Sequence, residues 1–188
     1  MPVVIVQLIE GYAPEDKARL CESLTDAFRL VVPAPVEGVT VMLNEVAPGA
    51  YMRGREAKEP APATPDPVAL VKDFLAAMEA RDLDTARGHL GDGFAMTFPG
   101  GVRMETLEEL VAFAAPRYRS VSKTFEGFDV GLSGDRTIVH CRGTLSGVWP
   151  DGSAFSGVRF TDRFEIAHGR IVRQDVWNDL AEMRGPAS

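Results

Sequence analysis

The sequence predicts an α+β protein built from two small domains in tandem. Three observations support this fold class: a strand-helix-strand pattern at the start of the chain, a proline-rich stretch after it, and a second part in which helical patterns precede strand patterns. Helices that come before a run of strands, rather than alternating with them, are typical of α+β domains. We expect one domain at residues 1–57, a linker at 58–66 and a second domain at 67–188.

The first domain shows a β-α-β pattern. Residues 3–9 are β-branched and apolar on both faces, which indicates a strand buried on both sides. From Pro14 to Val32 the apolar residues recur at helical spacing, and residues 39–46 give a second strand. A unit of roughly 55 residues is near the limit at which a chain buries enough surface alone, so we expect a homo-oligomer.

The linker is defined by its prolines. Residues 55–67 contain Pro60, Pro62, Pro65 and Pro67 but no large apolar residue. Each proline removes a backbone donor and restricts the residue before it, so neither a helix nor a strand runs through this stretch. We therefore expect a semi-rigid, extended connection between the domains.

The second domain begins with three helical patterns, at residues 67–80, 84–90 and 106–118. Thr106 and Glu109 stand at capping-box spacing, which marks the start of the third helix. Strand-like runs separated by turn residues follow. These runs cover residues 125–132, 136–149, 154–167 and 170–177. The order predicts a curved antiparallel sheet with helices packed on it.

Composition narrows the class of partner. The net charge of −7 argues against a sequence-independent nucleic-acid binder, which needs clustered Lys and Arg to neutralise phosphates. Cys21 and Cys141 lie far apart without metal or redox spacing, so we expect neither a metal nor a cofactor. No apolar stretch is long enough to span a bilayer, and residues 1–10 lack the basic start of a signal peptide. A cytoplasmic protein that acts on a small molecule is the expectation.

Pro2 is the most informative residue of the first domain. It opens an apolar strand that Glu10-Gly11 ends, one amphipathic helix follows, and the second strand carries VTVMLNEVAPGAY. In this order of parts, residues 2–57 resemble the 4-oxalocrotonate tautomerase family. The resemblance implies that Pro2 is a general base that moves a proton between carbons of an enol or enone acid. Removal of Met1 would leave the secondary amine that this role needs.

The family's other site residues differ in this chain. Two arginines bind the substrate's oxygens in the family, and the matching positions carry Tyr12 and Thr40. The matching aromatic residue is Tyr51. Arg53 and Arg55 follow it, and they offer an anion clamp from a different place in the sequence.

The second domain carries the segment GVRFTDRFEIAHGRIVRQDVWNDL and, before it, VALVKDFLAAMEARDLDTARGHLGDGFAMTFPGG. Through these segments, residues 66–184 resemble SnoaL-like and ketosteroid-isomerase-like domains of the nuclear transport factor 2-like fold. The resemblance implies a cone that holds a small apolar ligand, in which a protonated Asp162 donates a hydrogen bond to a dienolate oxygen. The isomerases' tyrosine and base positions match Phe74 and Phe98, so a steroid isomerase is not expected.

Strand parity selects the polar candidates. Phe160, Asp162, Phe164 and Ile166 share one face, which should be the core face. In the last strand the parity leaves either face free to line the cone. One face carries Arg173, Asp175, Trp177 and Asp179, and the other carries Gln174 and Asn178.

SnoaL-like cyclases use an aspartate on a late strand as acid/base, so the resemblance makes Asp175 and Asp179 candidates. The alternative is structural: Asp162 pairs with Arg159, Arg163 or Arg173, and Trp177 is a core aromatic residue.

Three functions fit these observations. The first is an isomerase that uses Pro2 on a small carbonyl or enol compound, while the cone binds or further transforms a related molecule. The second is a cyclase, dehydratase or isomerase whose only active site lies in the cone and uses Asp162 with Asp175 or Asp179. The third is a ligand-binding protein in which the first domain assembles the oligomer. A cone lined only by apolar side chains favours binding, whereas a buried unpaired carboxylate favours catalysis.

Overall fold

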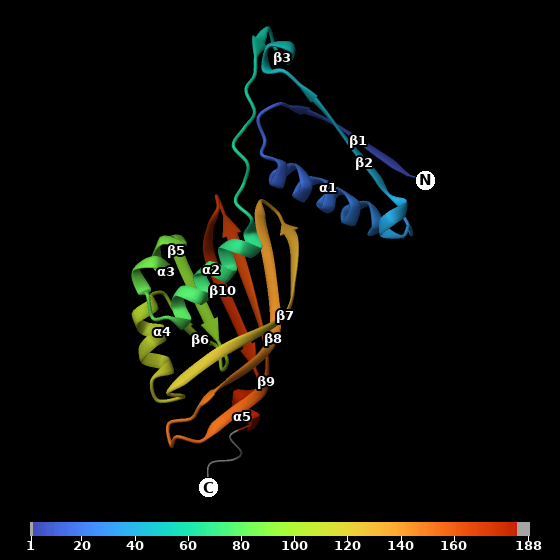
Figure 1. Cartoon of the computed structure of the whole chain (residues 1–188). Helices are drawn as coiled ribbons and strands as arrows, with labels where there is room; N and C mark the ends of the chain where they lie inside the picture. The colour runs from blue at the N-terminus through green and yellow to red at the C-terminus, as the bar shows by residue number, and fades with distance from the viewer. Residues whose placement is uncertain (1, 184–188) are drawn as a thin grey trace. The chain divides into compact units, whose positions relative to one another are not determined.

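A computed structural model describes residues 2–183 of the chain (Figure 1). The chain forms two compact units, residues 1–63 and 64–188. Each unit combines helices with strands, which confirms the α+β prediction. Met1 and residues 184–188, the last part of the predicted second domain, lie outside the described residues.

The first unit is a β-α-β element, as predicted. Strand β1 (Val3–Ile9) pairs in parallel with β2 (Thr40–Val46), and helix α1 (Pro14–Arg29) connects them (Figure 1). The helix ends three residues before the predicted Val32, where the Val31 amide donates to the Phe28 carbonyl in a tighter i→i−3 turn and Pro33 follows. Short elements complete the unit: η1 (Val36–Gly38), η2 (Pro48–Ala50), β3 (Met52–Arg53) and β4 (Glu56–Ala57). Residues 58–66 contain neither helix nor strand.

The two-stranded sheet of the first unit has one open face. Side chains alternate along β1, so Val4 and Val6 are half-buried on the side that α1 covers. Val3 and Ile5 on the other side are 52% and 61% exposed, and Met42, the register partner of Ile5, is 48% exposed. No residue from 2 to 63 is buried. Parallel sheets are normally covered on both faces, so one chain leaves this unit incomplete.

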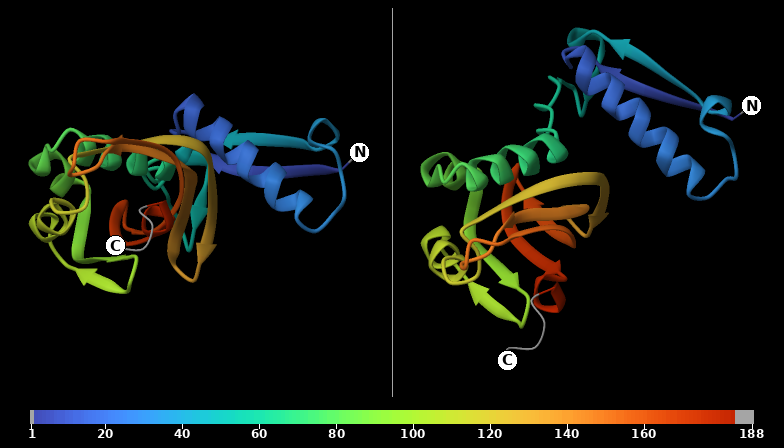
Figure 2. Two further views of the ribbon diagram at one scale, coloured as in Figure 1. Left: turned by 90° about the horizontal axis from the view of Figure 1, so that it is seen from below. Right: turned by 60° about the horizontal axis from the view of Figure 1, so that its bottom comes forward.

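The second unit is a six-stranded sheet with helices on its concave side (Figure 2). Its helices are α2 (Pro67–Glu79), α3 (Leu83–Gly88), α4 (Leu107–Ala114) and α5 (Leu180–Met183). Its strands are β5 (Leu90–Phe98), β6 (Val102–Met104), β7 (Ser120–Ser133), β8 (Arg136–Val148), β9 (Ala154–Ala167) and β10 (Arg170–Asn178). The strand order is β6-β5-β10-β9-β8-β7.

Side-chain caps and a proline set the helix ends. Asp66 accepts a hydrogen bond from the Val68 amide at 2.8 Å, which caps α2. Thr106 and Glu109 form the capping box that their spacing predicts for α4. This helix ends at Ala114 rather than at residue 118, because Pro116 has no amide hydrogen to donate to a carbonyl of the preceding turn.

The sheet is larger than the sequence indicated. The antiparallel meander β7 to β10 is confirmed, but β5 and β6 were not predicted. The segment that forms β5 contains Gly91, Asp92 and Gly93, which obscure an alternating pattern. It pairs in parallel with β10, with Thr97 opposite Asp175. In addition, β7 starts at Ser120 rather than at 125, which brings Lys123 into the sheet.

The core lies between the concave face and helices α2 and α4. Phe74 of α2 is fully buried and meets Phe94 and Phe164 edge to face, at centroid distances of 6.4 and 6.1 Å. Phe160, Phe164 and Ile166 of β9 are all buried. The predicted core face of this strand is therefore confirmed, and Asp162 lies in the middle of it with no exposed surface.

Candidate functional site

The second unit encloses a cavity of about 520 Å³ on the concave side of its sheet. This volume lies in the range of small-molecule sites. Most of the lining is apolar, as at Phe74, Leu145 and Val176. Lys123 and Asp162 bring charge to it. The cavity is the candidate site of this unit.

Asp162 is paired within the lining. The ammonium of Lys123 contacts Oδ2 of Asp162, and Nε2 of Gln174 donates to the same oxygen at 3.3 Å. Within residues 2–183, Oδ1 of Asp162 and Oε1 of Gln174 have no hydrogen-bond partner and no solvent contact. A buried carboxylate next to an ammonium is an ion pair, so the partner is a lysine and not one of the three arginines considered from the sequence.

A glycine allows β7 and β9 to meet across β8. Gly143 pairs with Phe125 on one side and Phe160 on the other, and these two rings lie 5.9 Å apart. A Cβ at Gly143 would come within 1.9 Å of the Thr124 carbonyl oxygen. The missing side chain lets β7 bend inward, and Lys123 then sits 4.3 Å from the centroid of the Phe160 ring.

Burial keeps two further groups of the second unit protonated. Burial, followed by the charge of Asp162, raises the pKa of the Cys141 thiol to about 12. Cys141 is therefore not a nucleophile at neutral pH. Burial also raises the pKa of Tyr118, which lines the cavity and keeps its hydroxyl proton.

The sequence-predicted residues of the cone fall into two groups. Phe74, Phe98 and Asp162 line the cavity. Asp175, Trp177 and Asp179 do not, because the other face of β10 turns inward. The residues on the inward face are Gln174, Val176 and Asn178. The structure therefore corrects the placement of the two late aspartates as cavity residues.

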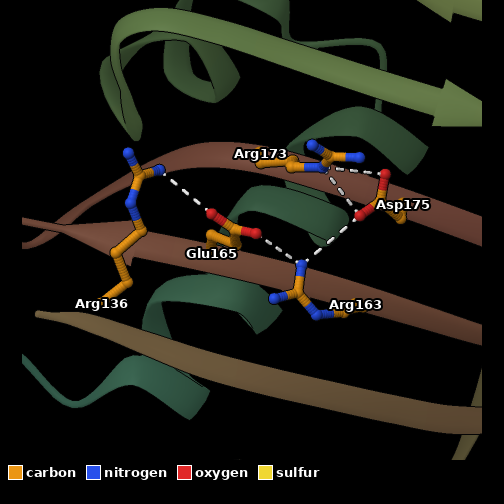
Figure 3. A network of polar contacts seen from close by, with 5 residues as sticks. All are labelled: Arg136, Arg163, Glu165, Arg173 and Asp175. Carbon is orange, nitrogen blue, oxygen red and sulfur yellow. Dashed lines mark hydrogen bonds and ion pairs between the residues drawn. The ribbon is translucent and has the colours of Figure 1, made fainter. Parts of the chain in front are cut away.

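Asp175 belongs to an ion network on the outer face of the sheet (Figure 3). It accepts from Nε of Arg173 at 2.9 Å and from Nη1 of Arg163 at 3.4 Å. Glu165 links Arg163 to Arg136, at 2.7 and 3.0 Å. The hydrogen bond that Arg173 donates to Asp175 raises the pKa of Arg173. Asp175, only 6% exposed, is thus committed to a structural ion pair.

The remaining late-strand residues lie at the surface. Asp179 pairs with Arg159 at 2.6 Å, and their side chains are 38% and 83% exposed. Trp177 is 51% exposed, so it is not the core aromatic residue that one interpretation of the sequence made it. Lys123 is the cavity group that the sequence did not single out, whereas Gln174 was named on one of the two faces of the last strand that could line the cone. A strand start at Ser120 would have revealed Lys123.

The first unit places its candidate residues at two ends of the sheet. Pro2 is half-buried and its carbonyl accepts from the Thr40 amide at 3.0 Å, so these two residues share one end. Tyr12, Tyr51 and Arg53 follow the far ends of β1 and β2. Seven extended residues span roughly 20 Å. One chain therefore brings Pro2 and Thr40 together and keeps the tyrosines apart from them.

No group of three His, Cys, Asp or Glu side chains within residues 2–183 could hold a metal ion. None of the helices in the same range is long and apolar enough to cross a membrane.

Family matches in both units support an isomerase-type enzyme with two domains. Residues 71–174, more than half of the chain, match the SnoaL-like domain family. Residues 2–59 match the tautomerase enzyme family. The chain belongs to both families, one in each unit, and both resemblances stated from the sequence are confirmed.

Relatives of known sequence match the first unit. A probable tautomerase of Streptococcus pyogenes is 32% identical over 59 residues, which is 31% of this chain and 97% of that protein. A probable tautomerase of Streptococcus mutans is 34% identical over the same length and the same shares.

Solved structures match the second unit. A nuclear transport factor 2-like protein of unknown function from Burkholderia pseudomallei has a TM-score of 0.52 at 22% identity, over 62% of this chain and 92% of its own. A putative SnoaL-like polyketide cyclase from Jannaschia sp. has a TM-score of 0.50 at 22% identity, over 69% and 99%. These likenesses show the fold of the cone.

Proposed function

We propose that the protein is a cytoplasmic isomerase that shifts a proton on a small carbonyl or enol compound, with Pro2 as the general base. The observation that carries the proposal is the position of Pro2. It stands at the head of the segment that matches the tautomerase family, and β1 holds it at the sheet end next to Thr40. Once Met1 is removed, its secondary amine takes a proton from one carbon and returns it to another.

The proposed site needs a second copy of the chain. Tyr12 and Tyr51 lie at the far end of the sheet from Pro2, and the open face with Val3 and Ile5 leaves apolar surface for a partner. A second copy packed on this face covers the apolar side chains and brings its own far-end residues toward Pro2. A homo-oligomer is therefore part of the proposal.

The test starts with the mature N-terminus. Mass spectrometry of protein purified from cells should show loss of Met1. The Pro2→Ala variant should then convert phenylenolpyruvate, an enol acid used as probe, about a hundredfold more slowly in kcat/KM, because general bases contribute on this scale. Ser23→Ala, an exposed helix residue of the same unit, is the control and should keep the full rate. An active protein that retains Met1 would rule out Pro2 as the base, because the nitrogen of Pro2 would then be part of an amide.

In this proposal Arg53 or Arg55 binds the negative charge of the substrate, because Tyr12 and Thr40 carry no charge. Arg55 sits at the turn of the β3–β4 hairpin with a φ of 72°, and Arg53 is exposed on β3. Substitution by alanine of whichever of these two arginines contacts the carboxylate should weaken binding of a carboxylate inhibitor by about tenfold to a hundredfold. This is the range for hydrogen bonds to charged groups. Arg29→Ala is the matched control. Unchanged affinity in both variants, measured by calorimetry, would mean that no clamp exists.

The cone is the second candidate site, for a cyclase, dehydratase or isomerase reaction. The specific observation in its favour is the Lys123–Asp162 ion pair in the lining of a mostly apolar cavity. A site that only binds an apolar ligand has no need of a buried charge, which costs free energy to desolvate. The pair therefore favours chemistry in this unit, while the late aspartates play no part in it.

A further inference from the structure

We propose that Lys123 is the group in the cone that binds a ligand's carbonyl or phenol-type oxygen and favours its oxyanion, with Asp162 as the residue that positions Lys123. This inference rests on the second candidate function, in which the cone acts on a carbonyl compound. It moves the donor role that the family resemblance gave to Asp162 onto a different side chain.

Asp162 itself is closed to ligands. It has no exposed surface, and Oδ2 is occupied by Lys123 and Gln174. Oδ1 is buried as well and meets no hydrogen-bond donor in the described part of the chain. While Lys123 is in place, a ligand in the cavity therefore meets the ammonium and not the carboxylate.

The ammonium of Lys123 has more N–H groups than its contact with Asp162 uses. An ammonium carries three N–H groups, and one of them serves Asp162. The side chain is 20% exposed and lines the cavity. No second hydrogen bond of its ammonium is seen among residues 2–183, and its other neighbour there is the Phe160 ring. The unused N–H groups are suited to an oxygen of a ligand in the cavity.

The charge balance selects the class of ligand. Asp162 compensates the charge of Lys123, so the ion pair itself carries no net charge and suits an uncharged oxygen beside it. The other charged lining residues are Lys72, Glu79, Arg81 and Arg119. Apolar rings and aliphatic side chains make up most of the lining. The expected ligand is therefore an apolar, ring-containing ketone, enone or phenol with one oxygen at Lys123.

A fixed ammonium in such surroundings stabilises negative charge on that oxygen. The interaction is stronger than in water, because little solvent screens it and no reorientation is needed. Ionisation of a bound phenol therefore reports on Lys123 without knowledge of the substrate or of any reaction.

The test uses 2-naphthol as the probe with the full-length protein. Its naphtholate form absorbs at longer wavelength than tryptophan and tyrosine, so the ionised fraction of bound probe can be titrated against pH. Lys123→Met should raise the pKa of the bound probe by about one unit or more, which is at least tenfold less naphtholate below that pKa. Arg103→Met removes an exposed cation of β6 that does not line the cavity, and it should leave the titration unchanged.

A second variant guards against a fold defect. Lys123→Met leaves the Asp162 charge alone in the core. The variant Lys123→Met/Asp162→Asn removes both charges, so it should bind the probe, and the pKa of the bound probe should again lie above its value in the wild type. Equal ionisation in the wild type and this double variant would overturn the inference. So would an equal loss of ionisation in Arg103→Met. A pKa of 2-naphthol that is the same when bound to the wild type as in water would also overturn the role of Lys123, while leaving both the Pro2 reaction and a different reaction in the cone intact.

Discussion

Replacing Ile5 by glutamate is expected to separate the copies of the protein and to abolish any reaction that depends on Pro2. Ile5 is 61% exposed in a single chain and lies between Val3 and Met42 on the open face of the first unit. Full burial of such a side chain contributes about 1.5–3 kcal/mol per copy, whereas an unpaired buried carboxylate opposes association by several kcal/mol. The substitution therefore turns a residue that favours association into one that opposes it, in every copy.

Light scattering measures the mass, and conversion of phenylenolpyruvate measures the activity. Ser23→Glu adds the same charge at an exposed position of α1 and should keep both. The cone should remain folded in Ile5→Glu, which binding of 2-naphthol reports. A monomeric wild type with full activity at micromolar concentration would contradict the shared site, because one chain keeps Pro2 and Tyr12 at opposite ends of β1.

The sequence could predict the elements in which apolar and polar residues repeat with a regular spacing. The strand from Val3 to Ile9 and the core face of β9 follow from residue type and alternation alone, and both were predicted to the residue. Helix starts were equally accessible, since the capping box at Thr106 is a local signal. Strand β5 was not, because its glycines interrupt the alternation and its parallel partner β10 lies 80 residues away in the chain.

The candidate site was predictable only in part. Alternation placed Asp162 in the core, but not its partner, because Lys123 belongs to the polar start of β7 and reaches Asp162 across β8 through the bend at Gly143. The face of β10 could not be chosen either, since polar residues occupy both sides and the register shifts between Ile171 and Arg173. A position two strands away depends on sheet curvature, which no local pattern encodes.

The Lys123–Asp162 pair should dominate the stability of the second unit. Lys123→Met leaves a buried carboxylate without a cation, and loss of one partner of a buried pair costs about 3–5 kcal/mol. Both tryptophans, Trp149 and Trp177, lie in the second unit, so urea unfolding followed by tryptophan fluorescence reports on this unit. The control, Lys72→Met, should cost no more than about 1 kcal/mol, the scale of a cation–π contact.

Adding Asp162→Asn to Lys123→Met separates the contribution of charge to stability from the contribution of packing. If the cost of Lys123→Met came from lost packing, adding Asp162→Asn would leave the stability where it was or lower it further. If it comes from the uncompensated charge, Asp162→Asn should restore about 2 kcal/mol or more, because asparagine keeps the shape and needs no counter-ion. Asparagine also keeps an oxygen for Nε2 of Gln174 and gains an amide that can donate to Oε1 of Gln174, the acceptor that is unpaired in the wild type. A double variant no more stable than Lys123→Met would show that this pair does not hold the deep end of the cavity by charge.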